Sequence, residues 1–259
     1  MDSIDIIKIQ NSEDSLARYE ELLLRRDNLR KMAEQFQIGY FKEFGDLIVD
    51  SFRIRVECIK KKKIIAYCQR QINQGKTING ARLDSFIARE MEEYQDDLNN
   101  IVAHNKAVKA SESISEYDLF TIKKIYRSLA KMIHPDLHPE LEGDPQILDY
   151  WERIVVAYEH NQLEDIKELD FMVRQYLEQK GNNDEEIIIP DLDKKIRHVE
   201  EESEKIISTE PYLYKLLLED DEAVAAKKDE LKAEIDSYTN YAAQLDEVIS
   251  QFDIERNYS

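Results

Sequence analysis

Apolar side chains recur at intervals of three and four residues along almost the whole chain, and this repeat places them on one face of an α-helix. Only 6 Gly and 5 Pro occur among 259 residues. Because sheet proteins need many turns and helical proteins need few, this scarcity together with the helical repeat predicts an all-α protein.

The formal net charge of -19 narrows the classes of partner. Nucleic acids and anionic membrane surfaces are bound through basic footprints, so we expect neither as a partner. The sequence has no apolar run of the roughly twenty residues that cross a bilayer, and no basic, then apolar, leader. Cys58 and Cys68 are ten residues apart, which suggests neither a disulfide framework nor a metal site. We therefore expect a cytoplasmic protein.

The N-terminal part predicts long helices that fold back on each other. One apolar face runs from Ser12 to Phe36, and Gly39 either breaks this helix or merely weakens it. A second run extends from Phe41 to a stop at Asn73-Gln74-Gly75, and a third opens near Arg82. Helices of about thirty residues are on the order of 45 Å long. An antiparallel hairpin or stalk is therefore expected.

The C-terminal part predicts a helix with a coiled-coil-like seam. Its seam residues alternate spacings of four and three, interrupted by one lysine: Val224, Lys228, Leu231, Ile235, Tyr238, Ala242, Leu245, Ile249 and Phe252. This seam must pack on the N-terminal hairpin or on a second copy of the chain, and the long helices are also where a client protein could bind. With 181–190 as a linker, we expect a hairpin in 1–112, a central module in 113–180 and a helical segment in 181–259.

The central module contains a basic helix in an otherwise acidic chain. Its apolar face carries Leu119, Ile122, Tyr126, Leu129 and Ile133. Between them lie Lys123, Lys124, Arg127 and Lys131, and no carboxylate occurs from Leu119 until Asp136. Ser111, Ser113 and Ser115 mark the preceding boundary, and Ser115 with Asp118 resembles a capping box.

A polar loop should separate this helix from the next one. Pro135 disfavours helical geometry at His134, so the helix should end there and leave His134 and Asp136 on an exposed loop. Asp144 as N-cap and Pro145 at the first helical position then start a helix whose apolar stripe includes Trp151 and Tyr158. Those two aromatic residues are expected in the core.

The order of residues around this loop resembles the J-domain of DnaJ-type co-chaperones. Tyr126, Arg127, Leu129-Ala130 and His134-Pro135-Asp136 stand at the spacing of the end of that family's second helix and its signature. The resemblance covers about a fifth of the chain. It implies that the basic face (Lys123, Lys124, Tyr126, Arg127 and Lys131) and the His-Pro-Asp loop dock on a DnaK-type chaperone and stimulate its ATP hydrolysis. Asp136 would accept a hydrogen bond from a partner arginine or brace Arg127.

The chain departs from the family in ways that predict a divergent, specialised member. The short first helix is missing directly upstream, Ser128 and Met132 replace residues that are often basic, and Leu137 follows the signature where lysine is common. The family's Gly-Phe-rich segment and cysteine-rich zinc repeats are also absent from the sequence. The alternative is a structural or scaffolding helical protein in which a J-like module serves only for packing.

Other chemistry is less well supported by the residue pattern. His134, Asp136 and His138 would form an incomplete metal site, and a His134–Asp136 catalytic pair lacks a nucleophile. No glycine-rich phosphate loop is present in the sequence. We therefore expect a protein that is not an enzyme and needs no metal or cofactor.

Overall fold

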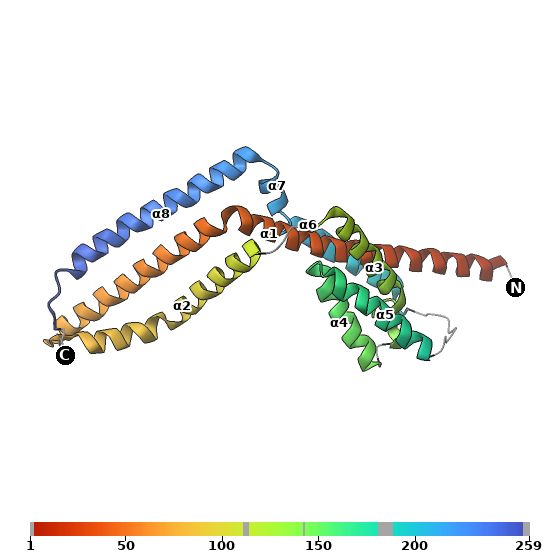
Figure 1. Cartoon of the computed structure of the whole chain (residues 1–259), viewed down its shortest axis with the longest axis horizontal. Coiled ribbons are helices and arrows are strands. Elements are labelled where there is room, and N and C mark those ends of the chain that lie inside the picture. Colours follow the sequence, from red (N-terminus) through yellow and green to blue (C-terminus); the bar gives the residue numbers. More distant parts are fainter. Residues whose placement is uncertain (1–2, 111–113, 142, 181–188, 256–259) are drawn as a thin grey trace. The chain divides into compact units, whose positions relative to one another are not determined.

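A computed structural model describes residues 3–110, 114–141, 143–180 and 189–255 of the chain (Figure 1). These residues form eight α-helices and two strands of two residues each, so the predicted all-α fold is confirmed. Within the described ranges, no helix combines the length and the apolar composition that a membrane span requires.

The helices follow one another with short connections. Their bounds are α1 Ser3–Asn73, α2 Gly80–Ala110, α3 Glu116–Ile133, α4 Pro145–Glu159, α5 Leu163–Lys180, α6 Leu192–Ser208, α7 Tyr214–Leu218 and α8 Asp221–Ile249. A single 3-10 turn covers Pro139–Leu141. The strands β1 (Ile78–Asn79) and β2 (Ile254–Glu255) pair in parallel, with Ile78 opposite Ile254.

The chain divides into two units, and each unit combines distant segments. Unit 1 contains Met1–Gln37 and Glu112–Tyr214, and unit 2 contains Ile38–Ser111 and Lys215–Ser259. This grouping differs from the three consecutive parts expected from the sequence, because the first part of α1 and the whole of α6 join the central module. The expected boundary residues Ser111 and Ser113 lie outside the described residues, as do residues 181–188 of the expected linker over 181–190.

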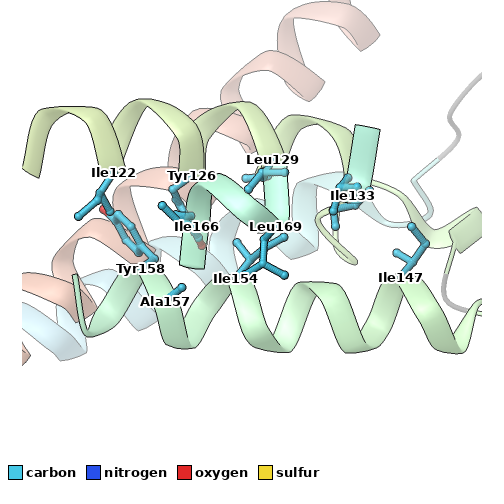
Figure 2. Close-up of a cluster of buried hydrophobic side chains, with 12 residues drawn as sticks. Ile122, Tyr126, Leu129, Ile133, Ile147, Ile154, Ala157, Tyr158, Ile166 and Leu169 are labelled. Atoms are coloured by element: carbon cyan, nitrogen blue, oxygen red, sulfur yellow. The ribbon is translucent and has the colours of Figure 1, made fainter. Parts of the chain in front are cut away.

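The main core of unit 1 lies between α3, α4 and α5. Figure 2 shows apolar side chains of α3 facing those of α4, with Ile166 and Leu169 of α5 between them. The α3 and α4 members follow the helical spacing expected from the sequence, and Ile122, Leu129, Ile133 and Ile154 are fully buried. Tyr158 is buried in this core and the half-buried Trp151 packs against it, as expected. This core fixes the ends of α3 and α4 that bracket the His-Pro-Asp loop.

A second apolar cluster in unit 1 joins α1, α6 and the loop itself. Tyr19 and Leu23 of α1 pack with Leu137, which directly follows the His-Pro-Asp tripeptide, and with Ile196 and Val199 of α6. The sequence places Tyr19 and Leu23 on one apolar face but does not identify what that face covers. In the folded chain it covers the loop.

Unit 2 is organised around residues 38–73 of α1. The helix continues through Gly39, so this glycine does not break it. It ends at Asn73 as expected, with Gly75 at a φ of +68° in the turn that follows. α2 then returns along α1 and packs through Leu83, Ile87 and Met91. The two helices form a hairpin (Figure 1).

The seam of α8 packs on α1. Ala242 and Leu245 of α8 form a buried cluster with Cys58 of α1, and Tyr238 packs against this cluster. Lys228, the interruption in the seam, forms an ion pair with Glu43 of α1. Of the two partners expected for the seam, the hairpin is therefore the one that the structure contains.

Candidate functional site

The loop that carries His134, Pro135 and Asp136 is held by capped helices on both sides. At the start of α3, the Ser115 hydroxyl accepts a hydrogen bond from the Asp118 amide at 3.1 Å, which confirms the predicted cap. At its end, α3 stops at Ile133, and His134 has the extended backbone that a residue before proline favours. The expected end of the basic helix is confirmed.

Asp144 begins α4 and also ties it to the end of α5. Its carboxylate accepts hydrogen bonds from the amides of Gln146 and Ile147, from the Tyr176 hydroxyl at 2.9 Å and from the Lys180 ammonium. Burial alone favours the neutral acid, but these donors outweigh it and lower the pKa of Asp144. The predicted N-cap is confirmed, and it anchors the loop's second end.

His134 is buried, contrary to the exposed loop expected from the sequence. Only 3% of its surface is exposed, while Pro135 and Asp136 are half-buried. The His134 ring lies 4.5 Å from the Trp151 ring, centroid to centroid. The prediction was wrong because Pro135 determines where the helix ends, whereas burial depends on α1, which covers the loop from a distant part of the sequence.

The surroundings of His134 keep its imidazole neutral. Nδ1 accepts a hydrogen bond from the Asp136 amide at 3.0 Å, so the proton of the neutral ring is on Nε2. Burial lowers the pKa of His134 to about 4, although Asp27 and Asp136 favour the charged form. Nε2 points towards the Asp27 carboxylate at 3.8 Å, a distance too long for a hydrogen bond.

Tyr126 connects the basic helix to α1. Its hydroxyl donates a hydrogen bond of 2.7 Å to Asp27, and its ring stacks on Tyr158 at 3.9 Å between centroids. Burial, reinforced by the nearby Asp27 carboxylate, raises the pKa of Tyr126 far above its usual range. Tyr126 is thus a buried link between α3, α4 and α1 rather than an open contact residue.

Asp136 faces an arginine of its own chain. Arg26 of α1 lies 3.8 Å from the Asp136 carboxylate, and it makes shorter pairs with Asp27 at 2.9 Å and Glu202 of α6 at 3.2 Å. Burial opposes the charge of Arg26, but these carboxylates outweigh it and raise the pKa of Arg26. Asp136 keeps 42% of its side chain exposed. Arg26, not Arg127, is therefore the cation beside Asp136.

The basic residues of α3 fall into two groups. Lys131 forms an ion pair of 2.7 Å with Glu20 of α1. The half-buried Lys123 faces Lys31 of α1, whose ammonium lies 4.0 Å from the Tyr158 ring centroid. Burial, together with repulsion from Lys123, lowers the pKa of Lys31 to about 8, although the nearby Glu34 carboxylate favours the charged form. Lys124 and Arg127 are exposed, and the paired Lys131 also keeps 58% of its side chain exposed.

A cavity of about 270 Å³ lies between α1 and the loop. The loop residues His134 and Asp136, the α1 residues Arg26 and Asp27, and Trp151 of α4 line it. Across the part of the chain that the structure describes, no group of three or more His, Cys, Asp and Glu is arranged to hold a metal ion. The site combines an arginine with carboxylates and aromatic rings, which suits protein recognition.

Glu20, Arg26 and Asp27 belong to this site, and sequence reasoning missed them. Asp27 lies one helical turn after Leu23 and two turns after Tyr19, on the face that the sequence predicts to be apolar. Charged residues on an apolar helical face usually have a charged or hydrogen-bonding partner. That position in the repeat is the signal that could have found them.

Comparisons of the chain with protein-family models, with curated proteins and with solved structures found no match.

Proposed function

We propose that this chain is a divergent J-domain co-chaperone, which recruits a DnaK-type chaperone and stimulates its ATP hydrolysis through the His-Pro-Asp loop. The observation that carries the proposal is the order Tyr126, Arg127, Leu129-Ala130 and His134-Pro135-Asp136 at the family's spacing. It is supported by the capped helix–loop–helix arrangement of α3 and α4 around that tripeptide. In this role the chain makes and breaks no bond itself.

The charge on α3 supports an acidic partner. Lys124 and Arg127 are exposed on a helix without carboxylates after Asp118, in a chain of net charge -19. A basic patch of this kind accelerates encounter with an acidic surface and sets its orientation. A cytoplasmic location is part of the proposal, since the two distant cysteines are free and buried.

A second candidate function is a structural or scaffolding role, in which the J-like module only packs. The burial of His134 and the pairing of Asp136 with Arg26 favour this alternative. In both features, a residue of the tripeptide contacts other residues of its own chain. The two candidates differ in whether the tripeptide also acts on another protein.

Steady-state ATP hydrolysis by a DnaK-type chaperone distinguishes them. We expect stimulation by the wild type and its loss in both loop variants, because His134→Gln replaces the imidazole and Asp136→Asn removes the negative charge of the loop. Asp149→Asn is the matched control, since Asp149 is an exposed residue of α4 that forms an ion pair with Arg153 one turn away. Stimulation that survives in both loop variants would refute the proposed mechanism. A folded wild type that gives none would favour the scaffold.

A further inference from the structure

The face of unit 1 that carries the His-Pro-Asp loop already has an occupant. One side of α1 supplies Glu20 to Lys131, Arg26 to Asp136, and Asp27 to Tyr126 and His134. These partners span almost two helical turns of α1 and lie opposite four positions of the proposed chaperone-binding face. The groups are complementary in charge and in hydrogen bonding. Carboxylates of α1 lie opposite Lys131 and the Tyr126 hydroxyl, and the guanidinium of Arg26 lies opposite Asp136.

The polar contacts of this occupant with His134 and Asp136 are long. The contacts of α1 with Asp136 and His134 are both 3.8 Å, beyond hydrogen-bond distance, and a cavity of about 270 Å³ remains between the two sides. Arg26 makes its closer pairs with Asp27 and Glu202, and Asp136 stays 42% exposed. An external arginine that approached Asp136 more closely would therefore make a better contact than Arg26 does.

We propose that residues 19–31 of α1 act as an internal competitor for this face, and that an external partner binds it by replacing α1. The partner must present similar chemistry: an arginine for Asp136, and carboxylates for Lys131 and for the Tyr126 hydroxyl. That the partner is a DnaK-type chaperone rests on the proposed function. The occupation of the face by α1 does not depend on it.

The exposed cations of α3 allow the partner to make its first contacts before α1 is displaced. Lys124 and Arg127 are exposed, and Lys131 keeps 58% of its side chain exposed although it is paired with Glu20 of α1. A partner first attracted to Lys124 and Arg127 would be positioned about two to three helical turns before the tripeptide, which directly follows the same helix. Binding would then proceed by exchange of ion pairs rather than by exposure of an unpaired loop.

Glu20→Lys tests the proposal, because it removes the Lys131 pair and places a like charge beside it. Glu21→Lys is the matched control, since it makes the same charge change about 100° further around the helix, at an exposed position. Hydrogen–deuterium exchange of the peptide 131–138, with acrylamide quenching of Trp151, reports the opening of the face. Trp151 is the only tryptophan and lies beside His134.

We expect Glu20→Lys to speed exchange in 131–138 on the order of fivefold and to increase Trp151 quenching, with helicity unchanged and Glu21→Lys like the wild type. Unchanged exchange and quenching in folded Glu20→Lys would overturn the internal competition. A second variant, Asp27→Asn, replaces the carboxylate opposite Tyr126 and His134 with a neutral amide at nearly constant volume. It weakens these charge-assisted contacts and should therefore give the same opening.

The chaperone assay separates this proposal from the proposed function. If both hold, Glu20→Lys stimulates ATP hydrolysis by a purified DnaK-type chaperone several-fold more than the wild type at concentrations below saturation. Faster exchange without stimulation by either protein would support the internal occupant and reject that chaperone as the partner. Faster exchange with stimulation equal to that of the wild type would overturn the competition, because α1 would then not limit binding.

Discussion

His134 gives the site a pH dependence whose sign follows from its burial. In the folded chain its pKa is lowered to about 4, whereas a histidine in an unfolded chain titrates near 6.5. As the pH falls below about 6.5, protons bind the unfolded chain first, and the free energy of unfolding decreases until the folded histidine titrates as well. The stability that comes from neutral His134 is therefore present above pH 6.5 and is lost towards pH 4.

We predict that the wild type loses about 1–2 kcal/mol more unfolding free energy between pH 7 and pH 5 than His134→Gln does. Urea denaturation followed by Trp151 fluorescence measures this difference, because Trp151 packs against the same core. His198→Gln serves as a control, since His198 is exposed on α6. Equal pH dependence in the wild type and His134→Gln would show that His134 is not held neutral by burial.

At the scale of elements, two glycines of α1 differ in the space that is available for a side chain. A Cβ at Gly45 would lie 2.0 Å from Oδ1 of the buried Asn105 of α2, whose amide donates to Asp46. A Cβ at Gly39 would lie 3.1 Å from the tip of Leu218 in α7, which can shift. Gly45 therefore permits the close approach of α1 and α2.

We predict that Gly45→Ala destabilises unit 2 by about 1–2 kcal/mol, because overpacking costs more than the roughly 0.5–1 kcal/mol that alanine gains over glycine in a helix. Gly39→Ala should be neutral or stabilising by up to about 1 kcal/mol. Thermal unfolding monitored by circular dichroism measures both. The interpretation fails if the two substitutions shift the midpoint in the same direction by similar amounts.

The elements that the sequence predicts well are those with local signals. Capping residues and the apolar repeat determine where α3 and α4 begin and end, and Pro135 ends α3, so these bounds follow from residues within one or two turns. The cover over His134 has no local signal. Tyr19 and Leu23 show an apolar face, but only the fold brings that face to Leu137, more than a hundred residues later.

The pairing of β1 with β2 in unit 2 also lacks a local sequence signal. Ile78 and Ile254 belong to segments of two strand residues each, too short for an alternating pattern, and they pair across most of the chain. Of the proposed site, the sequence alone identifies the tripeptide and the basic residues of α3. It does not identify Glu20, Arg26 and Asp27, because a charged residue on a long acidic helix looks solvated until its neighbours are known.

At the scale of the whole molecule, the two units have separate cores. The buried clusters of unit 1 draw on residues 19–24 of α1 and on α3 to α6, whereas those of unit 2 draw on residues 52–68 of α1, on α2 and on α8. No described residue belongs to clusters of both units. A substitution in one core should therefore change the stability of that unit first.

We predict that Ile154→Ala, in the core of unit 1, lowers the transition midpoint seen by Trp151 fluorescence on the order of 10 °C, because a fully buried isoleucine replaced by alanine costs about 2–5 kcal/mol. Leu83→Ala, in the core of unit 2, should leave the Trp151 transition in place and lower a separate part of the circular dichroism transition. Since Trp151 is the only tryptophan and lies in unit 1, its fluorescence reports on unit 1, whereas circular dichroism reports on both units. If both substitutions instead shift both probes equally, the chain unfolds as one cooperative block, and the division into two units has no thermodynamic counterpart.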